Sequence, residues 1–253
     1  MLMSSPFLML SAVKVTAETL EGIQRRGQLI VAVKDNLRPL GFRGQDGRLQ
    51  GLEIEIAQRL AQELFQRPDA LVLKPVLNRD RLTTVLDGQA DLVIAQVSLT
   101  EARSRLVTFS LPYYSDGTAL ITRSATLQKP TDLNNSAIVP SIAVLNGSSA
   151  IELLRYRFPK ATLVGVDSYE AGRQALDQGR AIAFAGETSV LSGWAQEFPG
   201  YRLLLPSLSV APLCVVLPKG LQYETLRQRV NELLARWQQE GWLKERAAYW
   251  GLS

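Results

Sequence analysis

A chain of 253 residues, 46% of them apolar and 21% charged, has the composition of a globular protein with room for two domains of about 100–150 residues each. The formal net charge is +4 and the basic residues are scattered, so we expect no nucleic-acid partner. The chain has no histidine and a single cysteine, Cys214, which excludes a Cys/His metal site and a Cys-His or Ser-His catalytic pair. We expect neither a metal nor a cofactor.

The N-terminus predicts a leader or an incomplete export signal over residues 1–19. Residues 6–13 are apolar, and residues 15–17 resemble a cleavage site, but no positive charge precedes Lys14 as a secretory signal requires. No run in the sequence approaches the roughly 18 uninterrupted apolar residues of a membrane span.

The first third of the chain predicts two buried strands separated by a helix. Residues 29–33 are an apolar run of strand length, residues 71–77 predict a second strand, and residues 56–64 carry apolar side chains along one helical face. Glu53 and Glu55 lie near the start of this helix, where they suit its dipole. We interpret them as structural and not as a catalytic pair, because residues two apart point in different directions on a helix.

Residues 82–114 carry the strongest functional pattern. A short helical segment ends at Gly88, residues 90–95 predict a buried strand, and the polar turn 96–100 leads to Arg103. Such a turn supplies N–H groups and hydroxyls at the carboxyl end of a strand, and an arginine supplies a two-pronged donor for a carboxylate. Ligands of open α/β sheets bind at that edge, so the pattern predicts an anion site of carboxylate size.

The second half of the chain continues the alternation of strands and helices. Further strands are predicted at residues 117–122, 141–145, 163–166, 180–185 and 213–217. Ser149 with Glu152, and Asp167 with Glu170, form capping boxes that predict two helix starts. The alternation predicts an α/β architecture with largely parallel sheets.

The central string resembles the signature of the periplasmic amino-acid-binding proteins of ABC transporters, in the extracellular solute-binding family that includes the glutamine and histidine receptors. The resemblance extends from about Arg26 to Leu252, and its most specific residues are Asp91 before the strand, then Ser98, Thr100 and Arg103, then Phe109-Ser110-x-Pro112-Tyr113. It implies the type II periplasmic-binding-protein fold: two α/β lobes joined by two crossing segments, with the ligand cleft between them. Lobe 1 would comprise residues 20–117 and 211–253, and lobe 2 residues 118–210, with hinge closure around the ligand.

The resemblance also implies the ligand contacts. Those to an α-carboxylate would come from Arg103, Ser98, Thr100, Ser148 and Ser149. The α-ammonium would be held by Glu187, where the family has an aspartate. The side-chain pocket would be formed by Lys34, Leu37, Asn78, Gln96 and Tyr114. Leu37 and Asn78 stand where the family often has stacking side chains, so the pocket lacks its usual aromatic walls.

These residues predict a monomeric periplasmic protein that captures a free amino acid for an ABC permease and is not an enzyme. One cation and no aromatic wall favour a polar or acidic amino acid; if Asp35 turned inward in place of Lys34, a basic one would fit. One alternative is a dehydratase acting on prephenate-like acids, with Glu187 as general acid. Another is a ligand-sensing receptor lobe, which ranks last because the chain ends at Ser253 without a signalling module.

Overall fold

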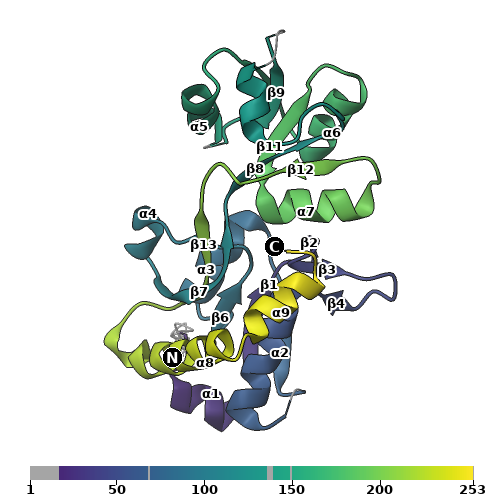
Figure 1. Ribbon diagram of the computed structural model, residues 1–253. Coiled ribbons are helices and arrows are strands. Elements are labelled where there is room, and N and C mark those ends of the chain that lie inside the picture. Colours follow the sequence, from purple (N-terminus) through teal and green to yellow (C-terminus); the bar gives the residue numbers. More distant parts are fainter. Residues whose placement is uncertain (1–16, 68, 136–138, 149, 253) are drawn as a thin grey trace, which may run out of the picture.

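The computed structural model describes residues 17–67, 69–135, 139–148 and 150–252, which form two α/β lobes (Figure 1). The sheet of the first lobe has the order β5-β1-β6-β13-β7; its strands are β1 (Leu29–Val33), β5 (Leu71–Pro75), β6 (Leu92–Ile94), β7 (Thr108–Asp116) and β13 (Ala211–Leu217). Strands β5, β1 and β6 are parallel, and β13 is antiparallel to both of its neighbours, β6 and β7.

Helices cover both faces of this first sheet because its strands are apolar on both faces. The helices of the first lobe are α1 (Leu20–Arg26), α2 (Leu52–Phe65), α3 (Arg81–Leu86), α4 (Glu101–Ser104), α8 (Glu224–Gln239) and α9 (Trp242–Tyr249). Val31 and Val33 pack in one core with α1, α2, α8 and α9, whereas Ala32 between them packs in a second core with Val85 of α3. The two-residue period of a strand therefore divides β1 between the two cores.

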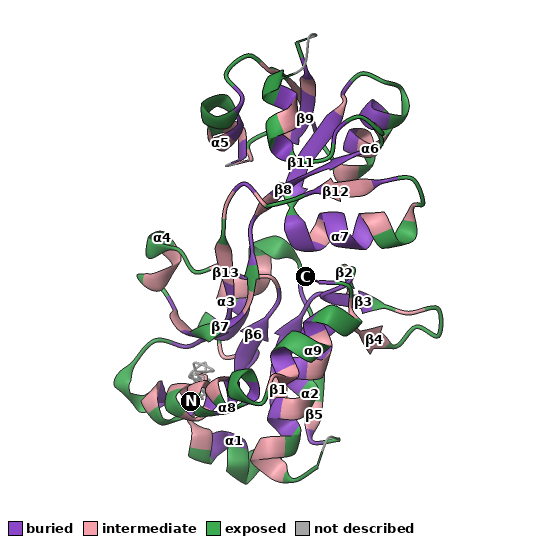
Figure 2. Ribbon diagram, in the orientation of Figure 1, coloured by how far each residue is buried: buried purple, intermediate pink, exposed green. Residues whose placement is uncertain are grey.

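The second lobe repeats this plan. Its sheet has the order β10-β9-β11-β8-β12, formed by β8 (Thr118–Thr122), β9 (Ser141–Leu145), β10 (Thr162–Val166), β11 (Ala183–Glu187) and β12 (Arg202–Leu204). Its helices are α5 (Ala150–Arg157), α6 (Tyr169–Asp177) and α7 (Thr188–Glu197). In this sheet β8 is antiparallel to both of its neighbours, β11 and β12. In both sheets the central strands, such as β1 and β6 in the first and β9 and β11 in the second, are mostly buried, whereas the edge strands β5 and β10 are partly exposed (Figure 2).

Short elements complete the described chain. A small antiparallel sheet contains β2 (Asn36–Leu37), β3 (Gly41–Arg43) and β4 (Leu49–Gln50), and the 3-10 turns are η1 (Asn78–Asp80), η2 (Pro130–Asn135) and η3 (Leu221–Tyr223). No helix within the described ranges is long and apolar enough to cross a membrane.

Two segments cross between the lobes, and they touch each other at Gly117. A Cβ at Gly117 would lie 1.9 Å from the carbonyl oxygen of Ser209, so only glycine allows the two backbones to approach this closely. The N–H of Thr118 donates to Ser209 Oγ at 3.0 Å, and the N–H of Leu208 donates to the carbonyl of Thr118 at 2.6 Å. The crossing is therefore a paired ribbon rather than two independent linkers.

Helix α7 of the second lobe also contacts the first lobe. A Cβ at Gly193 would lie 2.5 Å from the carbonyl oxygen of Arg38, which lies between β2 and β3. Gln196 Nε2 donates to the carbonyl of Trp250 at 2.9 Å, near the C-terminus, which Figure 1 places beside α7. The lobes therefore meet along α7 as well as at the crossing segments.

Most predicted elements are confirmed, with small corrections. The strands expected at 29–33 and 141–145 have those bounds, and in each sheet all strands but one run in the same direction. The strand expected at 180–185 instead spans 183–187. Helix α6 is capped by Ser168, whose Oγ accepts from the N–H of Ala171, so the predicted cap one residue earlier is wrong. Residues 1–16 of the predicted leader and Ser149 of the other capping box lie outside the described residues.

Candidate functional site

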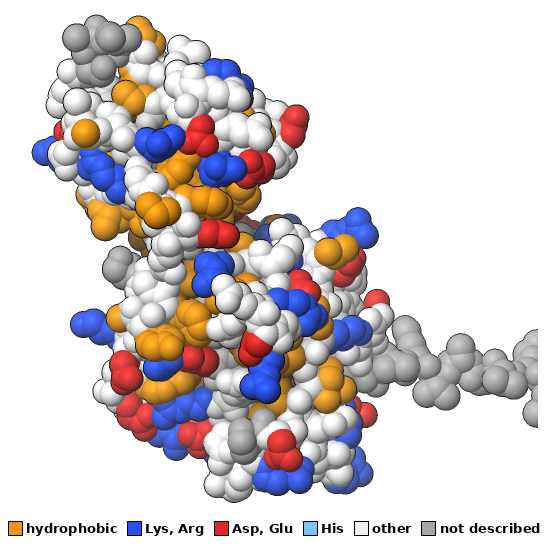
Figure 3. Space-filling model, turned by 90° about the vertical axis from the view of Figure 1, so that its right-hand side faces the viewer, with side chains coloured by type: hydrophobic (Ala, Val, Ile, Leu, Met, Phe, Trp, Pro, Cys, Tyr) orange, Lys and Arg blue, Asp and Glu red, His pale blue; other side chains and the backbone are white. Residues whose placement is uncertain are grey.

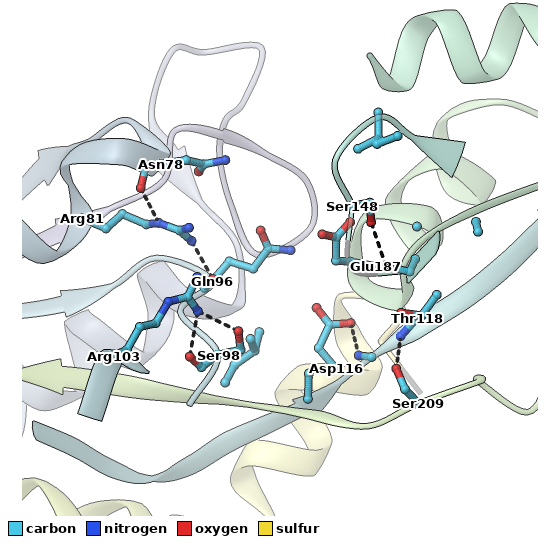
Figure 4. A pocket seen from close by; sticks show the side chains of 17 residues that line it. Asn78, Arg81, Gln96, Ser98, Arg103, Asp116, Thr118, Ser148, Glu187 and Ser209 are labelled. Atoms are coloured by element: carbon cyan, nitrogen blue, oxygen red, sulfur yellow. Dashed lines mark hydrogen bonds between the residues drawn. The ribbon is translucent and has the colours of Figure 1, made fainter. Parts of the chain in front are cut away.

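A cavity of about 260 Å³ lies between the lobes (Figure 4). Its first-lobe wall follows the carboxyl ends of β5 and β6, and its second-lobe wall follows those of β9 and β11. The polar and charged residues that line it are Asn78, Arg81, Gln96, Ser98, Arg103, Asp116, Thr118, Ser148, Glu187 and Ser209. In Figure 3, acidic and basic side chains lie at the narrowing between the lobes.

Arg103 and Ser98 line the first-lobe wall together. Arg103 Nη1 donates to both the carbonyl oxygen and Oγ of Ser98, each at 2.8 Å. Thr100 does not line the cavity; it is the N-cap of α4, and its Oγ1 accepts from the N–H of Arg103 at 3.3 Å. The motif therefore orients one half-buried guanidinium toward the cavity.

A second guanidinium, that of Arg81, was missed in the sequence. Arg81 is the first residue of α3, and its side chain is held by three backbone carbonyls: Nε donates to that of Asn78 at 3.0 Å, and Nη1 donates to those of Ala95 and Gln96 at 2.9 and 2.7 Å. Burial, followed by the charge of Arg103, lowers the pKa of Arg81. Neither arginine has a carboxylate within 4.0 Å among the described residues.

Gln96 connects the two arginine-bearing segments to a buried carboxyl group. Its N–H donates to Glu53 Oε1 at 2.7 Å, and its side-chain amide donates across the cleft to Ser189 Oγ at 3.3 Å. Its φ of 51° is in the left-handed region that side chains other than glycine rarely adopt. Glu53 is fully buried, also accepts from the hydroxyl of Tyr113 at 2.5 Å, and has its pKa raised by burial to about 7.

The second lobe contributes Ser148 and Glu187. Ser148 lies in the turn after β9, and its Oγ accepts from the N–H of Ala150 at 3.1 Å. Glu187 is the last residue of β11, and its carboxylate accepts a hydrogen bond from the hydroxyl of Tyr169. Burial, then the neighbouring Glu187 carboxylate, raises the pKa of Tyr169, so this phenol stays protonated. Ser149, the last of the predicted carboxylate contacts, lies outside the described residues.

Asp116 is a further carboxylate that the sequence did not reveal. It ends β7 at the crossing segment and is 5% exposed. Its oxygens accept from the N–H of Gly117 at 2.9 Å, and from the N–H and Oγ of Ser189 at 3.0 and 2.6 Å. Burial raises its pKa despite these hydrogen bonds, which act in the opposite direction.

Three residues expected in the side-chain pocket do not line this cavity. Lys34 is 5% exposed and its Nζ donates to the carbonyl of Val76 at 3.0 Å, so it is turned into the lobe. Leu37 packs against the core of the first lobe, and Tyr114 faces a separate, mainly apolar hollow beside α9. Asp35, the carboxylate of the basic-ligand alternative, lies 3.4 Å from Arg43 Nε and also lies outside the cavity wall.

In the ranges covered by the structure, no three Asp, Glu, Cys or His residues form a cluster that could hold a metal ion. The cavity instead presents guanidinium groups from the first lobe and carboxylates from Glu187 and the crossing strand. Such a set can bind opposite charges on one small molecule.

Two mixed α/β lobes, two crossing segments and a charged cavity at the carboxyl ends of the strands define a two-lobed binding protein. The chain matches the family model of the bacterial extracellular solute-binding proteins, family 3, over residues 29–253, and it belongs to that family. The resemblance found in the sequence is thereby confirmed.

Curated relatives are named as binding proteins. The glutamine-binding protein of Geobacillus stearothermophilus is 29% identical over 196 residues, which cover 77% of this chain and 74% of the relative. The ABC transporter glutamine-binding protein of Bacillus subtilis strain 168 is 24% identical over 237 residues, covering 90% and 85%. The L-cystine-binding protein of Escherichia coli K12 is 27% identical over 235 residues, covering 91% and 85%.

Solved structures share the fold. An ancestral cationic amino acid solute-binding protein has a TM-score of 0.77 at 23% identity, covering 92% of this chain and 99% of that one. The L-cysteine receptor of Neisseria gonorrhoeae has a TM-score of 0.70 at 24% identity, covering 92% and 93%. These likenesses confirm the predicted type II periplasmic-binding-protein fold.

Proposed function

We propose that this protein captures a free amino acid between its lobes and delivers it to an ABC permease. The observation that carries the proposal is the presence of opposite charges on facing walls of one cavity: Arg103 on the first lobe and Glu187 on the second. Arg103, with Ser98 and Ser148, would hold the α-carboxylate, and Glu187 would hold the α-ammonium. The names of the glutamine- and cystine-binding relatives support an amino acid ligand.

The proposed contacts are sufficient for useful affinity. Each charge-assisted hydrogen bond contributes roughly 1.5–3 kcal/mol net. Four or five of them, less the cost of ordering, reach the free energy of about −8 kcal/mol that corresponds to a micromolar dissociation constant. Closure of the lobes would bury both ligand charges against their partners, so the zwitterion would anchor the ligand.

The proposal includes the way the protein works in its transporter. The lobes, residues 20–117 with 211–253 and residues 118–210, would close about the crossing segments when ligand enters. The protein would act as a monomer in the periplasm, where the closed form docks on the permease. The extracellular family and the ABC transporter named for the Bacillus subtilis relative support this setting.

Isothermal titration with the twenty amino acids, on the wild type and on Arg103→Ala and Glu187→Gln, tests the proposal. At least one amino acid should bind, and each substitution should weaken it by about 30-fold or more, since removing one partner of a buried charge pair costs about 2–5 kcal/mol. Arg105→Ala is the matched control, because this neighbouring arginine is exposed and pairs with Glu101. Retention of full affinity in both cavity variants would contradict the proposal.

We further propose that the protein binds without catalysis. The dehydratase alternative used Glu187 as general acid, but Glu187 Oε2 accepts a hydrogen bond from the Tyr169 hydroxyl, which supports a role as an acceptor that holds the ligand's α-ammonium. Incubation with prephenate or arogenate should give no aromatic product. Its appearance at a rate that Glu187→Gln abolishes would establish an enzyme.

A further inference from the structure

We propose that the ligand is a dicarboxylic amino acid and that Arg81 binds its side-chain carboxylate. This inference rests on the proposed function and identifies the ligand class for the same cavity. It depends on Arg81, which is not among the motif residues of the resemblance, and on the way its guanidinium is held.

Arg81 is fixed in place but not saturated. Three of its five N–H groups are used, one on Nε and two on Nη1, and each donates to a backbone carbonyl of Asn78, Ala95 or Gln96. Neither N–H of Nη2 has a hydrogen-bond partner among the described residues. A planar cation held by carbonyls at the end of β6 needs no rearrangement to bind a carboxylate, which lowers the entropic cost of binding.

The first-lobe wall carries two guanidinium groups, and two anionic groups on the ligand would pair with both of them. Arg81 and Arg103 lie side by side in Figure 4, and neither is paired with a carboxylate of the described chain. The α-carboxylate of a zwitterion satisfies one guanidinium and leaves the other partly buried with no carboxylate within 4.0 Å among the described residues, which is costly. A second carboxylate on the same ligand removes that cost.

The acidic groups of the cavity do not offer an equivalent place for a basic side chain. Asp116 already accepts three hydrogen bonds, from Gly117 and from the N–H and Oγ of Ser189. Glu187 accepts from the Tyr169 hydroxyl and is assigned to the α-ammonium. Glu53 does not line the cavity, and its Oε1 accepts from the Gln96 N–H and the Tyr113 hydroxyl. Among the described residues, the free N–H groups of Arg81 and Arg103 therefore offer the ligand a place for carboxylates, whereas Glu187 is the one cavity carboxylate with most of its acceptor sites free, and it is assigned to the α-ammonium.

The test compares isothermal titrations of L-glutamate, L-aspartate, L-glutamine and L-arginine on the wild type, Arg81→Met and Arg79→Met. Methionine keeps the unbranched chain and removes the charge. Arg79 is the matched control, because its side chain is 80% exposed two residues away and does not line the cavity. Circular dichroism of each variant checks that it is folded.

The wild type should bind glutamate or aspartate at least about tenfold more tightly than glutamine or arginine. Arg81→Met should weaken the preferred dicarboxylate by about 30-fold or more, which corresponds to the roughly 2 kcal/mol lower bound for removing one member of a buried charge pair. The fold loss of affinity for glutamine in Arg81→Met should be at most about a tenth of the fold loss for the dicarboxylate. Arg79→Met should bind every ligand as the wild type does.

Tighter binding of glutamine or arginine than of both dicarboxylates by the wild type would overturn the inference, whatever the variants do. An equal loss for glutamate and glutamine in Arg81→Met would also overturn it, because Arg81 would then support the α-carboxylate or the wall itself. Failure of every amino acid to bind would instead refute the proposed function.

Discussion

Glu53 should make the stability of this protein fall as pH rises toward neutrality. Its side chain is fully buried at the start of α2, where Oε1 accepts from Gln96 and Tyr113 while Oε2 has no partner among the described residues. Burial is the largest cause of its raised pKa, about 7 against an ordinary 4.5. The native protein therefore keeps a proton on Glu53 at pH values where the unfolded chain has lost it.

The size of the effect follows from this difference in pKa. Below about pH 4.5 Glu53 is protonated in both the native and the unfolded state, so its titration does not change the free energy of unfolding. Between about 4.5 and 7 the unfolded state releases its proton first, so the free energy of unfolding falls. At about 1.4 kcal/mol per pKa unit, the total loss is about 3 kcal/mol, and above pH 7 it is complete. Glu53→Gln keeps an acceptor for Gln96 and Tyr113 but cannot titrate, so this loss should disappear.

The assay is urea unfolding of the wild type and Glu53→Gln at half-unit steps from pH 4.5 to 8. The chain has no histidine, so few other side chains titrate in this range. Burial also raises the pKa values of Asp91 and Asp116, but both are present in each protein and cancel in the difference. Between pH 4.5 and pH 8, the free energy of unfolding of Glu53→Gln should rise by about 3 kcal/mol relative to that of the wild type. A difference that stays constant with pH would refute the reasoning.

Two further substitutions test contacts outside the cavity wall. Gly193→Ala should weaken ligand binding by about 5- to 150-fold, because its Cβ would lie 2.5 Å from the carbonyl oxygen of Arg38 and overpacking costs about 1–3 kcal/mol. Titration calorimetry measures this, and an unchanged affinity would mean that α7 does not keep this contact in the bound state. Asp91→Ala should lower the free energy of unfolding by about 3–5 kcal/mol, since its buried carboxylate pairs with Arg26 and accepts from the N–H of Ile30 at 2.8 Å. Urea unfolding measures this loss. A value below about 1 kcal/mol would show that water solvates the Arg26 guanidinium once the Asp91 carboxylate is removed.

The parts of the fold that could be predicted from sequence are those determined by local pattern. Strand β1 is one apolar run between turn residues, and its bounds were predicted correctly. Arg103 could be assigned to the anion site behind the polar turn at a strand end because Ser98 and Thr100, which orient it, lie within five residues of it. In both cases the information that determines the structure is close in the sequence.

The rest of the site depends on contacts between distant residues. Lys34 follows β1, as a cleft residue would, but it points into the lobe because its Nζ donates a hydrogen bond to the carbonyl of Val76, just after the neighbouring β5. Arg81 begins a short helix, as many solvated arginines do. Only its position three residues after Asn78, at the carboxyl end of β5, could have drawn attention to it. Neither orientation follows from periodicity.

Gln96 shows why the missed residues belong together. With a φ of 51°, its N–H is bonded to Glu53 and its carbonyl to Arg81, while its side chain reaches Ser189 of the second lobe. A left-handed conformation at a residue other than glycine costs about 1–3 kcal/mol and persists only where surrounding contacts enforce it. Here those contacts are a buried carboxyl, the Arg81 guanidinium on the cavity wall and the opposite lobe. A change of charge at Glu53 therefore acts on the same residue that holds Arg81, and the pH that alters stability should alter ligand affinity too.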